Sequence, residues 1–96
     1  MPQALRPFAV TVNWNRAKDT LECVDSLYEG DQGVEVIVVD NGSSDGSAAL
    51  LRAHHPDLEL IENEANLGYV KGANQGIRLA LERGASHVLM INNDAI

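Results

Sequence analysis

The chain has 96 residues and a mass of 10.4 kDa, the size of one small domain or of a piece of a larger one. Hydrophobic residues make up 45% and charged residues 22%, a balance typical of globular proteins that excludes wholesale disorder. No apolar run is long enough for a membrane span, and the first residues lack the apolar stretch of a secretory signal. The single cysteine, Cys23, excludes an internal disulfide and favours a reducing cytosolic setting.

The charge balance is acidic, with seven basic and fourteen acidic residues, a net charge of −7 and a pI near 4.7. Non-specific binding to nucleic acids depends on lysine and arginine, so we expect no nucleic-acid partner. An anionic ligand would be repelled unless a cation or well-aimed backbone N–H groups offset the negative field.

Short apolar runs alternate with stretches of helical periodicity along the whole chain. The expected elements, in chain order, are a strand at 8–12, a helix after Asn15 with apolar positions at 17–28, a strand at 34–39, a helix at 47–53, a strand at 58–61, a helix from about 70 to Gly84 and a strand at 87–91. Asn15 is the expected N-cap of the first helix, and Ser44 or Asp45 that of the second.

This βαβαβαβ order predicts an α/β fold with a mostly parallel sheet, right-handed crossovers and helices on its faces. Ligands of such sheets bind beyond the carboxyl ends of the strands. The loops that follow the four strands are therefore the candidate sites.

The loop after the first strand is Asn13-Trp14-Asn15-Arg16. A turn followed by a helix cap explains it, and Trp14 is alternatively one wall of a pocket for a nucleotide base.

The loop after the second strand runs from Asp40 to Ser47 and contains two glycines. It has no Lys-Ser/Thr pair, which excludes a P-loop, and the twelfth residue counted from Asp40 is Leu51 rather than glutamate, which excludes an EF-hand. The first strand is also not followed by G-x-G-x-x-G, which argues against a dinucleotide fold. An acid at the end of a Val/Ile strand needs a partner or a function, and Asp40 can accept hydrogen bonds from a base N–H or a ribose hydroxyl.

The loop after the third strand leads into a helix with two interior glycines, which predict the close approach of another group. For Gly76 that group is expected to be the sheet, and for Gly72 it is the sheet or a ligand. Asn74 is expected on the apolar face of this helix. Lys71 is the candidate for a phosphate contact.

The fourth strand ends in Asn92-Asn93-Asp94. Amide and carboxylate oxygens suit a hard divalent cation such as Mg²⁺ or Mn²⁺, with water and substrate phosphates as the other ligands. Such a cation would also offset the repulsion between an anionic ligand and this acidic chain.

Four motifs, taken together, resemble the N-terminal half of family-2 glycosyltransferases, and most closely the bacterial rhamnosyltransferase-like branch. These motifs are V-N-W-N-R, V-V-D-N-G-S-S-D-G-S, N-x-G-x-x-x-G-x-N-x-G-I and L-M-I-N-N-D, and they extend from about Phe8 to Ile96. The resemblance implies a GT-A fold, a Rossmann-like sheet that holds a nucleotide-diphosphate sugar.

The resemblance also implies roles for individual residues. The implied nucleotide-sugar contacts are Asn13 and Asn15 beside the nucleotide, Asp40 and Asn41 at the base and ribose, Gly68, Lys71 and Asn74 at the base and diphosphate, and Asn92 at the first position of the metal motif. Asp94 matches the acid that coordinates the metal. Because Asn92 replaces an aspartate, metal dependence is open.

The chemistry that the resemblance implies is inverting transfer of a sugar to an acceptor hydroxyl. The metal would stabilise the leaving nucleoside diphosphate and a general base would take the acceptor proton. Family members are longer, and their general base lies in the C-terminal part. We therefore expect residues 1–96 to be the donor-binding half, truncated after the fourth strand, with no catalytic residue and no acceptor half.

Several finer expectations complete this interpretation. The donor is expected to be a dTDP- or UDP-sugar, with rhamnose leading, and the acceptor a glycan or a lipid-linked glycan bound by the missing half. The cytoplasm is the expected location, including the inner face of the membrane. Self-association through exposed sheet surface is also expected.

Other functions remain as alternatives. A stand-alone nucleotide-binding module would bind a nucleoside diphosphate without needing the sugar. A receiver-like phosphoacceptor domain would need acids where this chain has Asn13 and Asn63, and a nucleotidyltransferase would need a glycine-rich basic loop after the first strand.

Overall fold

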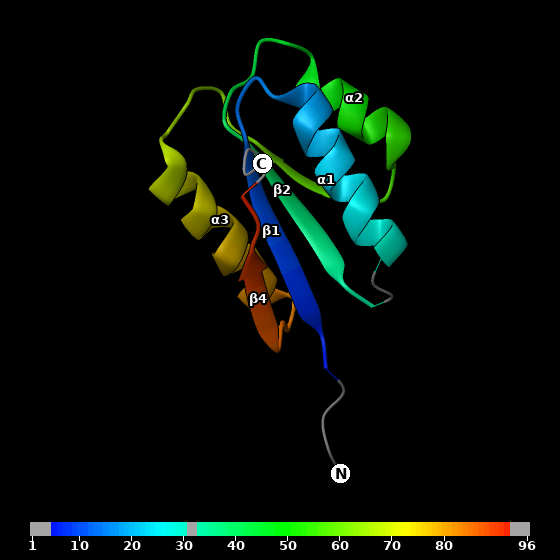
Figure 1. Cartoon of the computed structure of the whole chain (residues 1–96). Helices are drawn as coiled ribbons and strands as arrows, with labels where there is room; N and C mark the ends of the chain where they lie inside the picture. Colours follow the sequence, from blue (N-terminus) through cyan, green and yellow to red (C-terminus); the bar gives the residue numbers. More distant parts are fainter. Residues whose placement is uncertain (1–4, 31–32, 93–96) are drawn as a thin grey trace.

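The computed structural model describes residues 5–30 and 33–92, which form a four-stranded parallel sheet between two layers of helices (Figure 1). The elements, in chain order, are β1 (Pro7–Asn13), α1 (Ala17–Gly30), β2 (Glu35–Asp40), α2 (Ser47–His54), β3 (Glu59–Glu62), α3 (Tyr69–Glu82) and β4 (His87–Met90). The predicted α/β class, the number of elements and their order are confirmed.

The strands lie in the order β3-β2-β1-β4, and every neighbouring pair is parallel. The chain therefore moves outward from β1 through β2 to β3, and then crosses to the other side of β1 to form β4. This reversal places the carboxyl ends of β1 and β4 at a topological switch point, where α/β sheets bind ligands.

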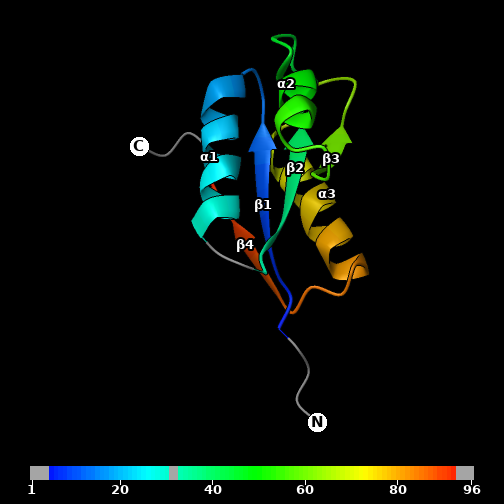
Figure 2. The same cartoon turned by 90° about the vertical axis from the view of Figure 1, so that its right-hand side faces the viewer.

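Both faces of the sheet are covered, as the continuous Val/Ile character of β2 requires. Helices α1 and α2 cover one face, where Val24 and Leu51 are fully buried against Val36 and Val38 (Figure 2). Helix α3 covers the opposite face and buries Ala80. Within the described residues, no helix combines the length and apolar character needed to cross a membrane.

The two interior glycines of α3 allow this helix to pack directly on the sheet. A Cβ at Gly76 would lie 2.3 Å from Val10 Cγ1, which confirms sheet packing as the reason for that glycine. A Cβ at Gly72 would lie 3.0 Å from Asn41 Nδ2 and 3.2 Å from Val12 Cγ1. The group that approaches Gly72 is thus the sheet and the loop beside it, one of the two alternatives that the sequence left open.

Strand β4 forms one edge of the sheet and is the least covered strand. Leu89 and Met90 expose 49% and 37% of their surface, although they pair with the fully buried Ala9 and Val10 of β1. The expected self-association would use such a surface, and it stays a prediction.

Candidate donor-binding site

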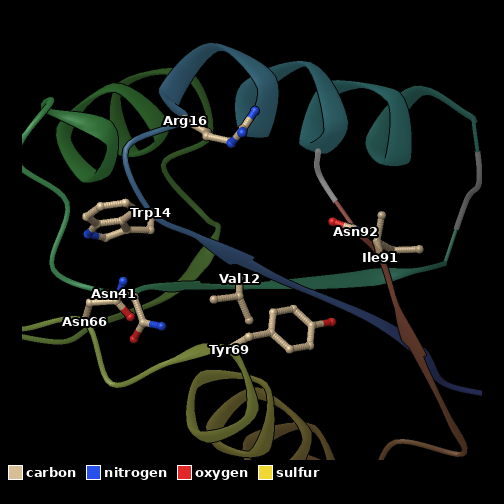
Figure 3. Close-up of a pocket in the computed structure, with 8 residues that line it drawn as sticks. All are labelled: Val12, Trp14, Arg16, Asn41, Asn66, Tyr69, Ile91 and Asn92. Atoms are coloured by element: carbon tan, nitrogen blue, oxygen red, sulfur yellow. The ribbon is translucent and has the colours of Figure 1, made fainter. Parts of the chain in front are cut away.

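A hollow of about 310 Å³ opens at the switch point, beyond the carboxyl ends of the strands (Figure 3). Its lining combines aromatic, amide and aliphatic side chains with one cation; the residues are Val12, Trp14, Arg16, Asn41, Asn66, Tyr69, Ile91 and Asn92. Trp14, Asn41 and Asn66 lie toward one end of the hollow, and Ile91 and Asn92 toward the other. The hollow therefore joins segments from every candidate loop.

A buried polar network fixes the loops after β1 and β2 to each other. Asn13 is fully buried, and its Nδ2 donates to Asp40 Oδ1 at 2.7 Å and to Ser43 Oγ at 3.0 Å. Ser43 Oγ donates to the same carboxylate oxygen at 2.6 Å, and the Ser43 N–H donates to Asp40 Oδ2 at 3.2 Å. Thr20 Oγ1 of α1 completes the network by donating to Asn13 Oδ1 at 2.6 Å. Both oxygens of Asp40 therefore have partners within the protein.

This network identifies the partner that a buried acid at the end of β2 requires. Asp40 is 4% exposed. The contact of Asp40 with a base or ribose stays a prediction, and a ligand would have to compete with three internal hydrogen bonds.

Asn15 was expected to be the N-cap of α1, but it connects the loop after β1 to the loop after β2 instead. Its backbone has a φ of 53°, its N–H donates to Ser43 Oγ at 2.8 Å, and its Oδ1 accepts the Ser44 N–H at 2.7 Å. The first N–H of α1, that of Ala17, donates instead to Asp45 Oδ2 at 3.1 Å. The side chain that accepts the first N–H of α1 thus comes from a loop 28 residues away in sequence.

The N-cap of α2 is Gly46, so the prediction of Ser44 or Asp45 at that position is wrong, although Asp45 does bond to the first residue of this helix. Asp45 Oδ1 accepts the Ser47 N–H at 3.0 Å and the Ser47 hydroxyl. The hydrogen bond from this hydroxyl, together with the N–H groups of Ala17 and Ser47, holds the pKa of the Asp45 carboxyl below its ordinary value.

We expect this lowered pKa to make the contribution of Asp45 to stability depend on pH. A group with a lowered folded-state pKa stabilises the fold above its unfolded pKa, about 3.9 for aspartate, and loses that effect as pH falls through the folded-state value. Asp45→Asn should therefore lower the free energy of unfolding by less than about 1 kcal/mol near pH 7, since the group is exposed. The difference from the wild type should shrink below about pH 4 in chemical denaturation experiments. A difference that stays constant from pH 7 to pH 3 would contradict this prediction.

A second network of amides connects the ends of β2 and β3 to α3. Asn63 and Gln75 exchange two hydrogen bonds, of 2.7 and 3.0 Å, and Asn63 Nδ2 also donates to Asn41 Oδ1 at 2.9 Å. Asn41 Nδ2 in turn donates to the Gly68 carbonyl at 3.1 Å. The amide that α3 contributes is thus Gln75. The expectation that Asn74 lies on the apolar face of this helix is wrong, because that side chain is exposed.

Two aromatic side chains line the hollow and remain exposed. Trp14 is 51% exposed and Tyr69 is 55% exposed. Large apolar rings left open beside polar groups are typical of ligand sites. The position of Trp14 in the lining agrees with the alternative in which this side chain forms one wall of a pocket. Sequence reasoning did not single out Tyr69.

The structure brings most of the predicted site residues to one edge of the sheet. Those at or next to the hollow are Asn13, Asn15, Asp40, Asn41, Gly68 and Asn92. Lys71 and Asn74 are exposed on α3 and do not line it. Asp94 lies outside the described residues. Sequence reasoning missed Arg16, Asn66, Tyr69 and Gln75; the glycines and amides around the start of α3 were the signal near the last three.

The described residues lack a cluster of the side chains that most often hold a metal ion. They contain no group of three His, Cys, Asp or Glu side chains that could hold an ion. Asp40 is the carboxylate nearest in sequence to the hollow's lining, and both of its oxygens accept internal hydrogen bonds. None of the described residues that line the hollow carries a carboxylate, so a divalent cation there would draw on amide oxygens, on a ligand and on residues outside the described ranges.

A parallel sheet with a polar, aromatic-lined hollow at its switch point is an arrangement at which α/β proteins bind ligands. The sequence model of the family described as Glycosyl transferase family 2 matches residues 8–96, and the chain therefore belongs to this family. The predicted family and its GT-A fold are thereby confirmed.

Two relatives extend this result. The chain is 37% identical over 87 residues to the low-salt glycan biosynthesis hexosyltransferase Agl10 of Haloferax volcanii. This alignment covers 88% of the chain and 26% of Agl10. The chain is also similar to the mannosyltransferase PcManGT of Pyrobaculum calidifontis, solved in complex with GDP-Man and Mn²⁺. That similarity has a TM-score of 0.73 and 29% identity, and it covers 95% of this chain and 28% of the neighbour. The chain thus spans about a quarter of the length of these relatives. Both are archaeal proteins, and neither is described as a rhamnosyltransferase.

Proposed function

We propose that this chain is the donor-binding part of a glycosyltransferase and that the hollow at the switch point receives a nucleoside diphosphate sugar. The observation that carries the proposal is the lining of that hollow by two exposed aromatic rings, several amides and one arginine. Rings can stack on a base, amides can hydrogen-bond its edge, and a cation can meet the phosphates. The neighbour solved with GDP-Man supports a donor of this chemical class.

The hydrogen-bonded loops supply the rigidity that such a site needs. Asn41 is 2% exposed and bonded on both sides of its amide, so its role is to fix the position of the Gly68 carbonyl and the start of α3. Tyr69 directly follows Gly68, and the amide network therefore also fixes one aromatic wall. A site whose walls are held before the ligand arrives loses less entropy on binding.

A divalent cation, Mg²⁺ or Mn²⁺, is part of the proposal. Asp94 would hold it together with the donor phosphates, and the cation would supply charge neutralisation of the diphosphate. The Mn²⁺ in the complex of the similar mannosyltransferase supports this assignment.

The complete enzyme would transfer a sugar to an acceptor hydroxyl with inversion, on the cytoplasmic side of the membrane. Residues beyond this chain would supply the general base and bind the glycan or lipid-linked acceptor. We retain uridine or deoxythymidine diphosphate as the expected leaving group, and guanosine diphosphate is the contrasting possibility because the neighbour was solved with GDP-Man.

Calorimetric titration of the chain with UDP, dTDP and GDP, each with and without Mn²⁺, tests the proposal. We expect one diphosphate to bind with a Kd below about 1 mM and Mn²⁺ to tighten that binding. Asp94→Ala should remove the gain from Mn²⁺, whereas Asn74→Ala, on the exposed face of α3, should leave it unchanged.

Two results would change the conclusion. Failure of the folded wild type to bind any of the three diphosphates would contradict the proposal. If a further titration with the sugar-linked form of the preferred diphosphate gives the same affinity, and Mn²⁺ has no effect, a stand-alone nucleotide-binding module is favoured.

A further inference from the structure

The hollow has an unusual charge balance for a site that receives a diphosphate. Of the described residues that line it, Arg16 is the only one with a charged side chain. A diphosphate brings at least two negative charges to a chain of net charge −7. Any cation within reach of the ligand therefore has a large effect on its affinity, since the field of the remaining chain opposes binding.

Arg16 lies at the edge of the hollow, where its side chain can contact a ligand that extends out of it. It directly precedes α1 and approaches from the side of the hollow opposite Tyr69 (Figure 3). A second hollow, of about 520 Å³, shares Trp14 and Arg16 with the first. Arg16 therefore lies at the boundary between the two.

The present partner of Arg16 is easily exchanged. Its Nη1 contacts Asp19 Oδ2 at 3.3 Å, and both side chains are about half exposed. A single exposed ion pair at this distance contributes little to stability. A phosphate can accept two parallel N–H bonds from the planar guanidinium, which makes it the better partner.

The other positive groups nearby are less suited to this contact. Lys18 lines the second hollow but not the first, and Lys71 is exposed on α3 and lines neither. The N–H of Ala17 at the start of α1 already donates to Asp45 Oδ2. We infer that Arg16 binds the diphosphate of the donor by exchanging Asp19 for a phosphate, and that Asp19 weakens donor binding by competing for the guanidinium. This inference rests on the proposed function.

The test compares each diphosphate with its own nucleoside, so that the phosphate contact is isolated from base recognition. The preferred diphosphate and the corresponding nucleoside are titrated against wild type, Arg16→Ala, Arg16→Lys, Asp19→Asn and Lys71→Ala, which replaces the rival candidate for the phosphate contact. We expect Arg16→Ala to weaken diphosphate binding about tenfold and nucleoside binding by less than about twofold. Arg16→Lys should fall between wild type and Arg16→Ala, because it keeps the charge but loses the fork.

Asp19→Asn gives the result that a merely structural arginine would not produce. Removal of the competing carboxylate should tighten diphosphate binding about two- to threefold and leave nucleoside binding unchanged. Circular dichroism and thermal unfolding of each variant check that the fold is intact.

The two proposals fail in different ways. If the wild type binds neither diphosphate nor nucleoside, the proposed function fails and this inference fails with it. If the wild type binds the diphosphate but Lys71→Ala weakens it as much as Arg16→Ala does, or if Arg16→Ala weakens nucleoside and diphosphate equally, only the role of Arg16 is wrong.

Discussion

Replacement of Asn13 by alanine is expected to lower the free energy of unfolding by about 3 kcal/mol. Asn13 is fully buried and its amide makes three hydrogen bonds, to Asp40, Ser43 and Thr20. The substitution removes one of the donors to a buried carboxylate and an acceptor of the Thr20 hydroxyl. Loss of a partner by a buried charged group costs more than the same loss at an exposed site.

Chemical denaturation of the wild type, Asn13→Ala and the control Asn66→Ala measures this difference. Asn66 is an exposed amide in the same site whose Oδ1 accepts the Gly68 N–H, so its replacement should cost less than about 1 kcal/mol. Nucleotide binding by Asn13→Ala should also weaken, because the loops after β1 and β2 lose their shared partner. Equal, small changes in the two variants would show that the buried network does not hold these loops.

The elements of this fold could be predicted from local sequence because each carries its own periodicity. The Val/Ile run of β2 was expected at 34–39 and lies at Glu35–Asp40, and the helix expected at 47–53 is Ser47–His54. The short β3, at the other edge of the sheet, was also placed to within one residue, at Glu59–Glu62. Burial on one or both faces constrains which residues are apolar, and that constraint is visible without the tertiary structure.

The contacts between loops could not be predicted in the same way. Asn15 and Asp45 both resemble local helix caps, yet Asn15 bonds to Ser44 and Asp45 bonds to Ala17 across about 28 residues. Strand order decides which loops meet, and nothing in the local pattern of β4 indicates that it pairs with β1.

The prediction of Asn74, where the structure uses Gln75 as the inward-facing amide of α3, was wrong for a similar reason. Neighbouring positions on a helix differ by about 100° in direction, so an apolar stripe of this width leaves the amide at its border uncertain. The partner that settles the choice, Asn63, belongs to the loop after β3 and becomes relevant only when α3 is packed on the sheet. Sequence reasoning thus identified the polar loops but could not assign their internal hydrogen bonds.

Substitution of Gly76 by alanine should destabilise the fold by about 2 kcal/mol, although alanine is the better helix former. The added Cβ would lie 2.3 Å from Val10 Cγ1 and 3.2 Å from Val39 Cγ2, and both valines are fully buried in the centre of the sheet. A valine in a strand has few alternative rotamers, so α3 must move away from the sheet. Asn74→Ala, on the exposed face of the same helix, should change the free energy of unfolding by less than about 0.5 kcal/mol.

A double-mutant cycle with Val10→Ala separates a steric cause from a general weakening of α3. Val10→Ala alone should destabilise the protein, because it removes buried methyl groups. In that background the Cβ of Gly76→Ala enters the space that Cγ1 has left, and the second substitution should cost less than it does in the wild type. Since α3 also positions Gln75 and Tyr69, the same clash should weaken nucleotide binding, and Val10→Ala should restore part of it. Strictly additive effects on stability would mean that the close contact between α3 and β1 does not explain this glycine.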